Sequence, residues 1–360
     1  MIRFLHTADW QLGLKLAFIG GDRGAYARAE RFEVVRRIAG VARERQVQAV
    51  VVAGDVFDDN GVGRDTIQRA RDALAEFAPV PVLLLPGNHD AGGPDSVLRR
   101  LDAGRHVHAL LDRAPWGGVP GVRFYPCPLL RRHEKDDPSA HLPPREPTDP
   151  IRVAVAHGGL LEFGEGESPN RIDAPSVLAK GFDYLALGDW HGLLSFGPRV
   201  FYPGAPEATR FKEKKPGHVL LVEIDEPGAV PRVLEIEVQR TRWIEHREVI
   251  LDDTHVDAVG AWLDALPTRS MALVDLTLVG NVSLEGRARL DALLERASAE
   301  LMHLRVHEDE LQDRPSPSDL ARLEGDGLIG RAAQRLRASE APEAADALRL
   351  LHRLSEEKRS

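Results

Sequence analysis

The feature of the sequence that most constrains its fold is a short apolar run that ends abruptly in polar residues. The pattern occurs five times in the first 191 residues. Such runs are typical of strands that are buried on both faces. The runs 2–5, 49–53, 80–85, 151–156 and 184–187 end in His6-Thr7-Ala8-Asp9, Gly54-Asp55, Pro86-Gly87-Asn88-His89-Asp90, His157-Gly158-Gly159 and Gly188-Asp189-Trp190-His191.

Helical apolar periods at 32–41 and 67–77 separate the first three runs. Strands that alternate with helices indicate a largely parallel sheet, and such sheets carry their sites at the carboxyl ends of the strands. We therefore expect the five polar clusters to lie close together.

The clusters combine carboxylate, carboxamide and imidazole side chains without a thiolate, which is a ligand set for hard or borderline divalent cations. Phosphate ester hydrolysis uses two such cations about 3.5–4 Å apart, and a bridging carboxylate can hold them at that distance. Asp55 is the best-placed candidate for the bridge. Taken singly, Asp9 could be a helix cap, Asn88 with Asp90 a turn, and His157 a satisfied loop histidine. The five clusters together favour the metal site.

The motifs also resemble those of a known family. The segments 6–13, 54–58, 87–90, 156–159 and 188–191 read His-Thr-Ala-Asp-Trp-Gln-Leu-Gly, Gly-Asp-Val-Phe-Asp, Gly-Asn-His-Asp, Ala-His-Gly-Gly and Gly-Asp-Trp-His. In this order they resemble the calcineurin-like metallophosphoesterases over roughly residues 1 to 240. The opening segment and Tyr-Pro-Gly-Ala-Pro-Glu at 202–207 are most similar to the SbcD-type DNA repair exonuclease subunits. The resemblance implies an α/β fold, a sandwich of two mixed β-sheets flanked by helices.

The same resemblance implies the roles of the site residues. Asp9 and His191 would bind a first metal ion and Asp55 would bridge. A second ion would be bound by Asn88, His157 and Asp189.

The resemblance gives the neighbouring residues supporting roles. His89 would protonate the leaving oxygen or stabilise the transition state, with Asp90 orienting it. Asp58 would support the loop, and His6 would support the site from behind it or simply bond to the site loop.

Two residues depart from the family pattern. Gln11 stands where the family usually has histidine, and Asp189 replaces the first histidine of the usual Gly-His-x-His. Both changes replace imidazole nitrogen with oxygen, so we expect two divalent ions, manganese first and magnesium as the alternative, rather than zinc. Gln11 is counted among the metal-site residues, and whether it ligates is left open.

The leading functional hypothesis is a metal-dependent DNA phosphodiesterase, an SbcD-like nuclease subunit of a DNA-processing complex. The net charge of −9 argues against coating nucleic acid by charge alone, so basic segments at 23–37 and 210–215 would guide the strand. The resemblance implies an SMC-like ATPase resembling SbcC as partner and suggests a homodimer. The alternatives are a small-molecule or protein phosphatase, or a weakly active structural subunit of an ATPase complex.

The expected domains are a catalytic domain at 1–242, a βαβαβ cap at 243–310 and a C-terminal helical segment at 311–360 that could dock the partner. In that segment an apolar stripe of Ala344, Ala347, Leu348, Leu351 and Leu354 could equally pack on its own chain. No apolar run spans a bilayer, no secretory signal is expected and the single cysteine suits a reducing compartment, so we expect a cytoplasmic protein that does not enter membranes.

Overall fold

A six-stranded sheet carries three of the five motif-bearing strands side by side. The computed structural model, which describes residues 1–161, 169–314, 328–339, 341, 343–344, 346–348 and 350–351, places its strands in the order β11-β10-β1-β2-β3-β4. Strands β1 to β4 run parallel, whereas β10 and β11 are antiparallel to their neighbours. The bounds are β1 Ile2–Thr7, β2 Ala49–Val52, β3 Val82–Leu84, β4 Val107–Ala109, β10 His218–Ile224 and β11 Arg232–Glu237.

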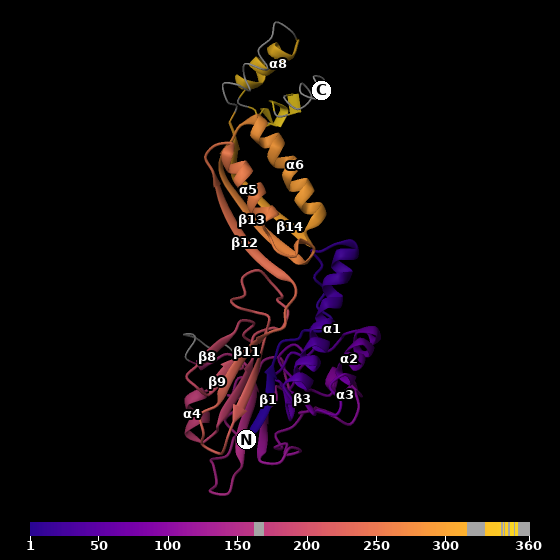
Figure 1. Cartoon of the computed structure of the whole chain (residues 1–360), viewed down its shortest axis with the longest axis vertical. Coiled ribbons are helices and arrows are strands. Elements are labelled where there is room, and N and C mark those ends of the chain that lie inside the picture. The colour runs from indigo at the N-terminus through magenta and orange to yellow at the C-terminus, as the bar shows by residue number, and fades with distance from the viewer. Residues whose placement is uncertain are drawn as a thin grey trace. The chain divides into compact units, whose positions relative to one another are not determined.

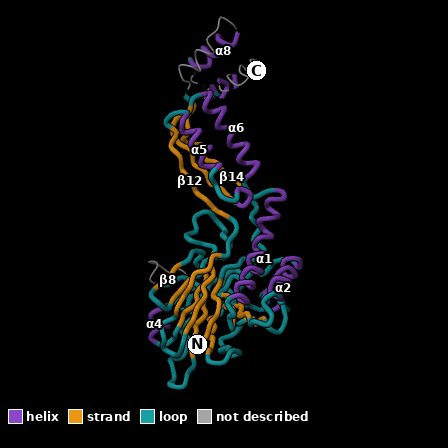
Figure 2. Tube along the Cα trace, in the orientation of Figure 1, coloured by secondary structure: helices purple, strands orange, loops and turns teal. Residues whose placement is uncertain are grey.

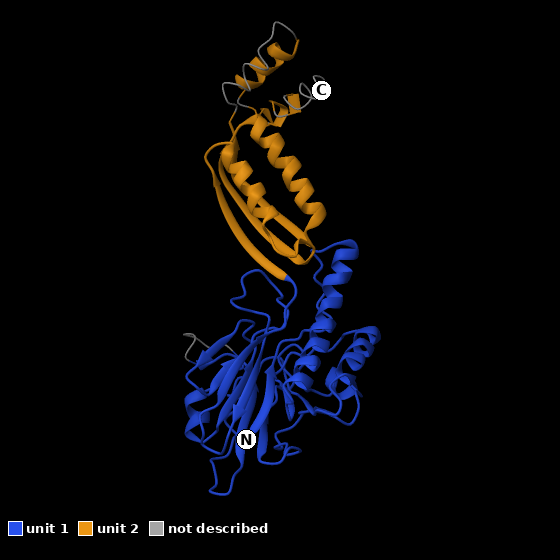
Figure 3. Ribbon diagram, in the orientation of Figure 1, with its two compact units in different colours: residues 1–241 blue, residues 242–360 orange. Residues whose placement is uncertain are grey.

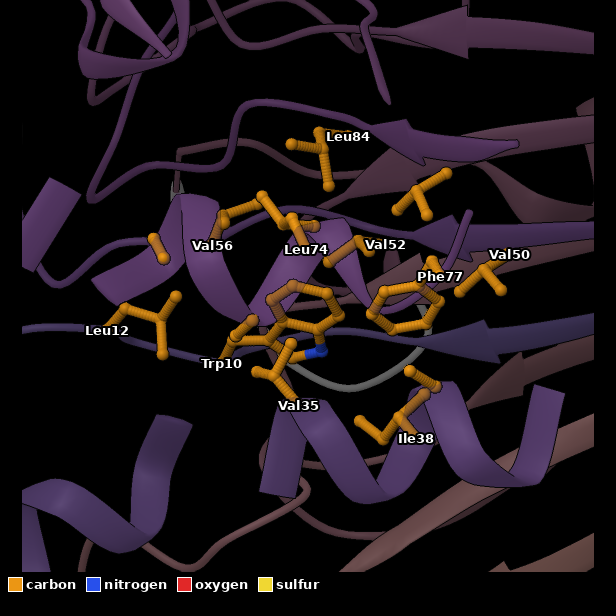
Figure 4. Packing of buried hydrophobic residues seen from close by; sticks show 14 of the residues in the cluster. Trp10, Leu12, Val35, Ile38, Val50, Val52, Val56, Leu74, Phe77 and Leu84 are labelled. Carbon is orange, nitrogen blue, oxygen red and sulfur yellow. The ribbon is translucent and has the colours of Figure 1, made fainter. Parts of the chain in front are cut away.

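Helices α1 (Gly21–Glu44) and α2 (Arg64–Ala75) cover one face of this sheet, and the short α3 (Val97–Arg100) follows β3 (Figures 1 and 2). Figure 4 shows the packing, with Trp10 lying between the strands and the helices. The Trp10 ring stacks on Phe77 at 6.3 Å between centroids, and its Nε1 donates to Thr7 at 2.9 Å. The segment after β1 is therefore anchored in the core before it reaches the site.

A second sheet of five strands carries the other two motifs, in the order β5-β6-β7-β9-β8. It faces the first sheet, and Ile2 and Phe4 of β1 share one buried cluster with Phe124, Val153 and Tyr184. The expected sandwich of two mixed sheets flanked by helices is confirmed. The bounds are β5 Val122–Cys127, β6 Ile151–His157, β7 Tyr184–Gly188, β8 Leu194–Phe196, β9 Val200–Tyr202 and α4 Ala174–Ala179.

The sequence did not predict β4, β5, β8 and β9. Three of these are only three residues long, too short for a periodic signal, and β5 contains Pro126. The expected loop at 128–150 contains no helix or strand.

Contacts divide the chain into two units, Met1–Thr241 and Arg242–Ser360 (Figure 3). The second unit holds a parallel sheet β12-β13-β14 packed against α5 and α6. Its first strand begins at Arg242, before the expected start at 247, and its last continues past the expected boundary at 310. The bounds are β12 Arg242–Ile250, α5 Thr254–Asp264, η2 Arg269–Met271, β13 Ala272–Val282, α6 Leu284–Glu300, β14 His303–Asp313 and α8 Leu328–Arg337.

Part of the C-terminal apolar stripe packs on its own chain. Leu348 is buried with Leu284 and Ala333, and Leu351 packs against this cluster. The expected break at 315–317, Leu354 and most of the expected loop at 163–175 up to residue 168 lie outside the described residues. Among the helices that are described, none has the length and apolarity to cross a bilayer.

Candidate active site

The loops that follow β1, β2 and β7 bring three predicted site carboxylates together through an unusual backbone. Asp9, Gln11, Asp55 and Asp189 have φ angles of 55°, 44°, 53° and 96°. This left-handed region is tolerated by aspartate but uncommon for other non-glycine residues, and such outliers gather at functional sites. The amide of Asp9 donates to Gly54 at 3.0 Å and that of Gln11 to Asp55 at 2.9 Å, so the first two loops fix each other.

One group of ligand-type side chains gathers around His157. Its Nδ1 donates to the carbonyl of Ala53 at 2.8 Å, which turns Nε2 toward the site. Nε2 lies 3.2 Å from Oδ1 of Asn88, 3.5 Å from Oδ1 of Asp55 and 3.7 Å from Oδ1 of Asp189. Two ligands that are each about 2.1 Å from one ion lie roughly 3 to 4 Å apart, so these spacings suit a shared cation.

A second group joins Asp9, Gln11 and His191. Nε2 of His191 lies 4.0 Å from Oδ1 of Asp9 and 3.2 Å from the amide nitrogen of Gln11. The backbone amide of Asp189 donates to both carboxylate oxygens of Asp9, at 3.1 and 3.2 Å. Gln11 therefore contacts the nitrogen of His191 that would bind metal.

Two glycines make room for this convergence. A Cβ on Gly54, whose φ is +96°, would lie 2.1 Å from Nδ1 of His157, and a Cβ on Gly87 would lie 2.1 Å from Oδ1 of Asp55. Both distances are far inside van der Waals contact. The glycines in the Gly-Asp and Gly-Asn-His-Asp motifs are therefore required by the approach of side chains from other strands.

His89 lies at the edge of the site with its side chain 31% exposed, and its Nε2 is 4.0 Å from Oδ2 of Asp55. Its Nδ1 donates to the backbone carbonyl of Asp58 at 2.7 Å. The carboxylate of Asp90, expected to orient His89, instead accepts from the amides of Gly87 at 2.7 Å and Phe57 at 3.1 Å. The orienting role is therefore corrected from Asp90 to the Asp58 carbonyl, and Asp90 fixes the two loops around the site.

The electrostatics of the buried groups fit a bound cation. Ligand atoms of Asp9, Asp55 and His157, all buried, lie within 4.8 Å of one another. Burial raises the pKa of Asp9 to about 6, and the nearby Asp55 adds to the rise. Burial also acts on His157, but the carboxylates of Asp55, Asp9 and Asp189 outweigh it and hold the pKa of His157 well above its usual value. A divalent cation would relieve the repulsion between the two buried carboxylates.

The structure also identifies a buried acid that the sequence did not. Glu213, with a side chain 2% exposed, accepts from Nδ1 of His191 at 2.6 Å, and Thr209 bonds to both. Burial opposes ionisation of Glu213, but the hydrogen bond from His191 lowers the pKa of that carboxyl. The only sequence signal was a lone acid in a basic run, and we interpreted that run as a cationic segment.

His6 supports the site from behind β7. Its Nε2 donates to the carbonyl of Leu187 at 3.1 Å and its Nδ1 accepts from the Tyr184 hydroxyl at 3.0 Å. Burial lowers the pKa of His6 to about 3, so the ring is neutral. The histidine thus joins the two sheets just before Asp189.

The two predicted basic segments differ in availability. In the segment at 23–37, Arg31 is buried and donates to the carbonyls of Trp10, Gln11, Glu207 and Ala208, while Arg36 and Arg37 are paired with glutamates. These three arginines are structural, which corrects their expected role in guiding a strand.

The segment at 210–215 instead borders the site. A pocket of about 230 Å³ opens beside it, lined by Asp189, Trp190, His191, Gly192, Arg210, Lys212, Glu213 and Lys214. Cationic side chains therefore stand next to two predicted metal ligands.

Comparison with known proteins agrees with this geometry. The family model described as calcineurin-like phosphoesterase matches residues 2–219. The DNA double-strand break repair protein Mre11 of Methanopyrus kandleri is 26% identical, over 94% of this chain and 78% of its own length. The D subunit of the nuclease SbcCD from Rhodobacter capsulatus is 28% identical, over 92% of this chain and 94% of its own length. The crystal structure of TT1561 from Thermus thermophilus aligns with 66% of this chain and 99% of its own at a TM-score of 0.42 and 12% identity.

Proposed function

Because the chain belongs to the calcineurin-like phosphoesterase family, a family of hydrolytic enzymes, we propose that it is a metal-dependent DNA phosphodiesterase, an SbcD-like nuclease subunit of a DNA repair or DNA-processing complex. The observation that carries the proposal is the pocket beside Asp189 and His191 that is lined by Arg210, Lys212 and Lys214. A diester backbone presents phosphates on both sides of the scissile one, and cations next to the metal ligands suit such a substrate better than an isolated monoester.

The residues would divide between two ions. His191 and Asp9 would hold the first, with Gln11 beside them, while Asn88, His157 and Asp189 would hold the second and Asp55 would bridge. When bound, two divalent cations neutralise charge on the phosphoryl oxygens and lower the pKa of a water. The oxygen-rich donor set supports manganese, with magnesium as the alternative.

His89 is the proton donor or the transition-state partner in this proposal. Its exposed ring reaches the side of the site where Asp55 lies, and the Asp58 carbonyl fixes its Nδ1. Nε2 is thus left to face the leaving oxygen of a bound phosphate.

The proposal includes a partner. Relatives named as one subunit of a nuclease support assembly with an SMC-like ATPase resembling SbcC, and with a second copy of this chain. Leu348 packs on its own chain, so the C-terminal residues offered for docking are the exposed Leu328, Ile329 and Leu350. The single, buried Cys127 suits a reducing cytoplasm, which we retain as part of the proposal.

The test is manganese-dependent hydrolysis of single-stranded DNA, plasmid DNA and para-nitrophenyl phosphate by the full chain and by His89→Ala. The proposal predicts DNA cleavage that falls by about 10²–10⁴-fold in the variant. Hydrolysis confined to the small ester would indicate a phosphatase, and no hydrolysis of any substrate would indicate a structural subunit.

A further inference from the structure

Trp190 is a large aromatic side chain that stands exposed between two predicted metal ligands, Asp189 and His191. It is 47% exposed and lines the pocket of about 230 Å³ described above. The four other tryptophans are at least partly buried, namely Trp10, Trp116, Trp243 and Trp262. Exposing an indole leaves apolar area in water, so one that faces a pocket next to an active site suggests a ligand surface.

The backbone holds this side chain in place. A Cβ on Gly192 would lie 2.1 Å from the carbonyl oxygen of Lys214 and 3.2 Å from Nε1 of Trp190. The loop after β7 and the segment around Lys214 are therefore packed together without space between them. The indole and the cations are thus held on adjoining walls of one pocket.

The other wall of the pocket is cationic. Arg210 is 71% exposed and lies 3.6 Å from Glu213, an acid that already bonds to His191 and Thr209. Lys212 and Lys214 are exposed, and no carboxylate in the part of the chain that the structure describes pairs with either. An aromatic face beside several cations is the combination that binds single-stranded nucleic acid, in which bases stack and phosphates pair with Lys or Arg.

We propose that Trp190 is a stacking platform for an unpaired nucleobase next to the phosphate held at the metal site, with Arg210, Lys212 and Lys214 binding the flanking phosphates. The inference rests on the proposed function, because it names the form of DNA that the site would take. A base stacked on Trp190 must have left its duplex, so the site selects single-stranded or frayed ends.

The test measures binding without catalysis, in the presence of a chelator. The full-length protein is titrated into fluorescently labelled oligothymidylate of about 12 nucleotides and into an abasic strand of the same length and charge. Trp190→Ala is compared with Trp190→Phe, and with Phe196→Ala as a control at an exposed aromatic outside the pocket.

We expect the unaltered protein to bind oligothymidylate about tenfold more tightly than the abasic strand, because stacking is the only difference between them. Trp190→Ala should abolish that preference and leave the affinity for the abasic strand unchanged, whereas Trp190→Phe and Phe196→Ala should retain it. Equal preference in the unaltered protein and Trp190→Ala, or no binding of either strand, would overturn the inference.

The same strands with manganese separate this inference from the proposed function. A Trp190-dependent base preference without cleavage by the unaltered protein would refute the nuclease and keep the platform. Cleavage of oligothymidylate at unchanged KM in Trp190→Ala would keep the nuclease and refute the platform.

Discussion

Glu213 accepts a hydrogen bond from Nδ1 of His191 at 2.6 Å, although 22 residues separate the two. The bond fixes the imidazole so that Nε2 faces Asp9 and Gln11. A carboxylate in this position orients a metal-binding histidine and raises its basicity.

We therefore predict that Glu213→Gln weakens manganese binding about 10- to 100-fold. Isothermal titration calorimetry on the apo-protein would measure it. Glu235→Gln, which removes an exposed carboxylate paired with Lys215, is the matched control and should leave the affinity unchanged. Equal affinities in all three proteins would contradict a role for Glu213 in holding His191.

Gly54→Ala should abolish metal binding and hydrolysis. The added Cβ would lie 2.1 Å from Nδ1 of His157, at a residue with a φ of +96°. The imidazole must then move away from Asp55, or the loop must refold. Gly40→Ala, in the middle of α1 with nothing within 4 Å, should instead stabilise the protein by roughly 0.5–1 kcal/mol.

Thermal unfolding and manganese titration of the two alanine variants would show the contrast. Normal metal affinity in Gly54→Ala would mean that the contact between Gly54 and His157 does not define the site.

Manganese affinity should fall as the pH decreases from about 8 to 5. The metal binds deprotonated ligands, while burial raises the pKa of Asp9 to about 6 and neighbouring carboxylates hold the pKa of His157 well above its usual value. Binding must therefore displace protons. Calorimetry in buffers of different ionisation enthalpy would count the released protons, and an affinity independent of pH would refute this account of the ligands.

His6 should make the free energy of unfolding sensitive to acid. Burial lowers the pKa of His6 to about 3 in the folded protein, against 6.5 for the exposed side chain. The unfolded chain therefore binds the proton more readily, so the contribution of neutral His6 is fully present above pH 6.5 and declines as the pH falls toward 3.

His6→Gln can still reach the Tyr184 hydroxyl or the Leu187 carbonyl, but it cannot be protonated. We predict a variant less stable at about pH 8 whose stability depends less on pH between about 6.5 and 4, as measured by urea unfolding. Parallel curves for the two proteins would exclude His6 as the acid-sensitive group.

Much of the site could be predicted from the sequence because its residues end buried strands, and the pleat and parallel order of those strands bring the ends together. The apolar runs before Asp9, Asp55 and His157 carry that information directly. Glu213 and Trp190 could not be predicted, since their roles depend on how two irregular loops pack at Gly192. Likewise, Arg31 is one of several arginines in the sequence, and only the packing shows that it is buried.

The central claim is that the donors of Asp9, Asp55, Asn88, His157, Asp189 and His191 hold two cations. Anomalous diffraction from crystals grown with excess manganese tests it most directly. The account predicts two peaks about 3.5–4 Å apart, one on each side of Asp55. A single peak away from Asp55, or no peak among these residues, would contradict it.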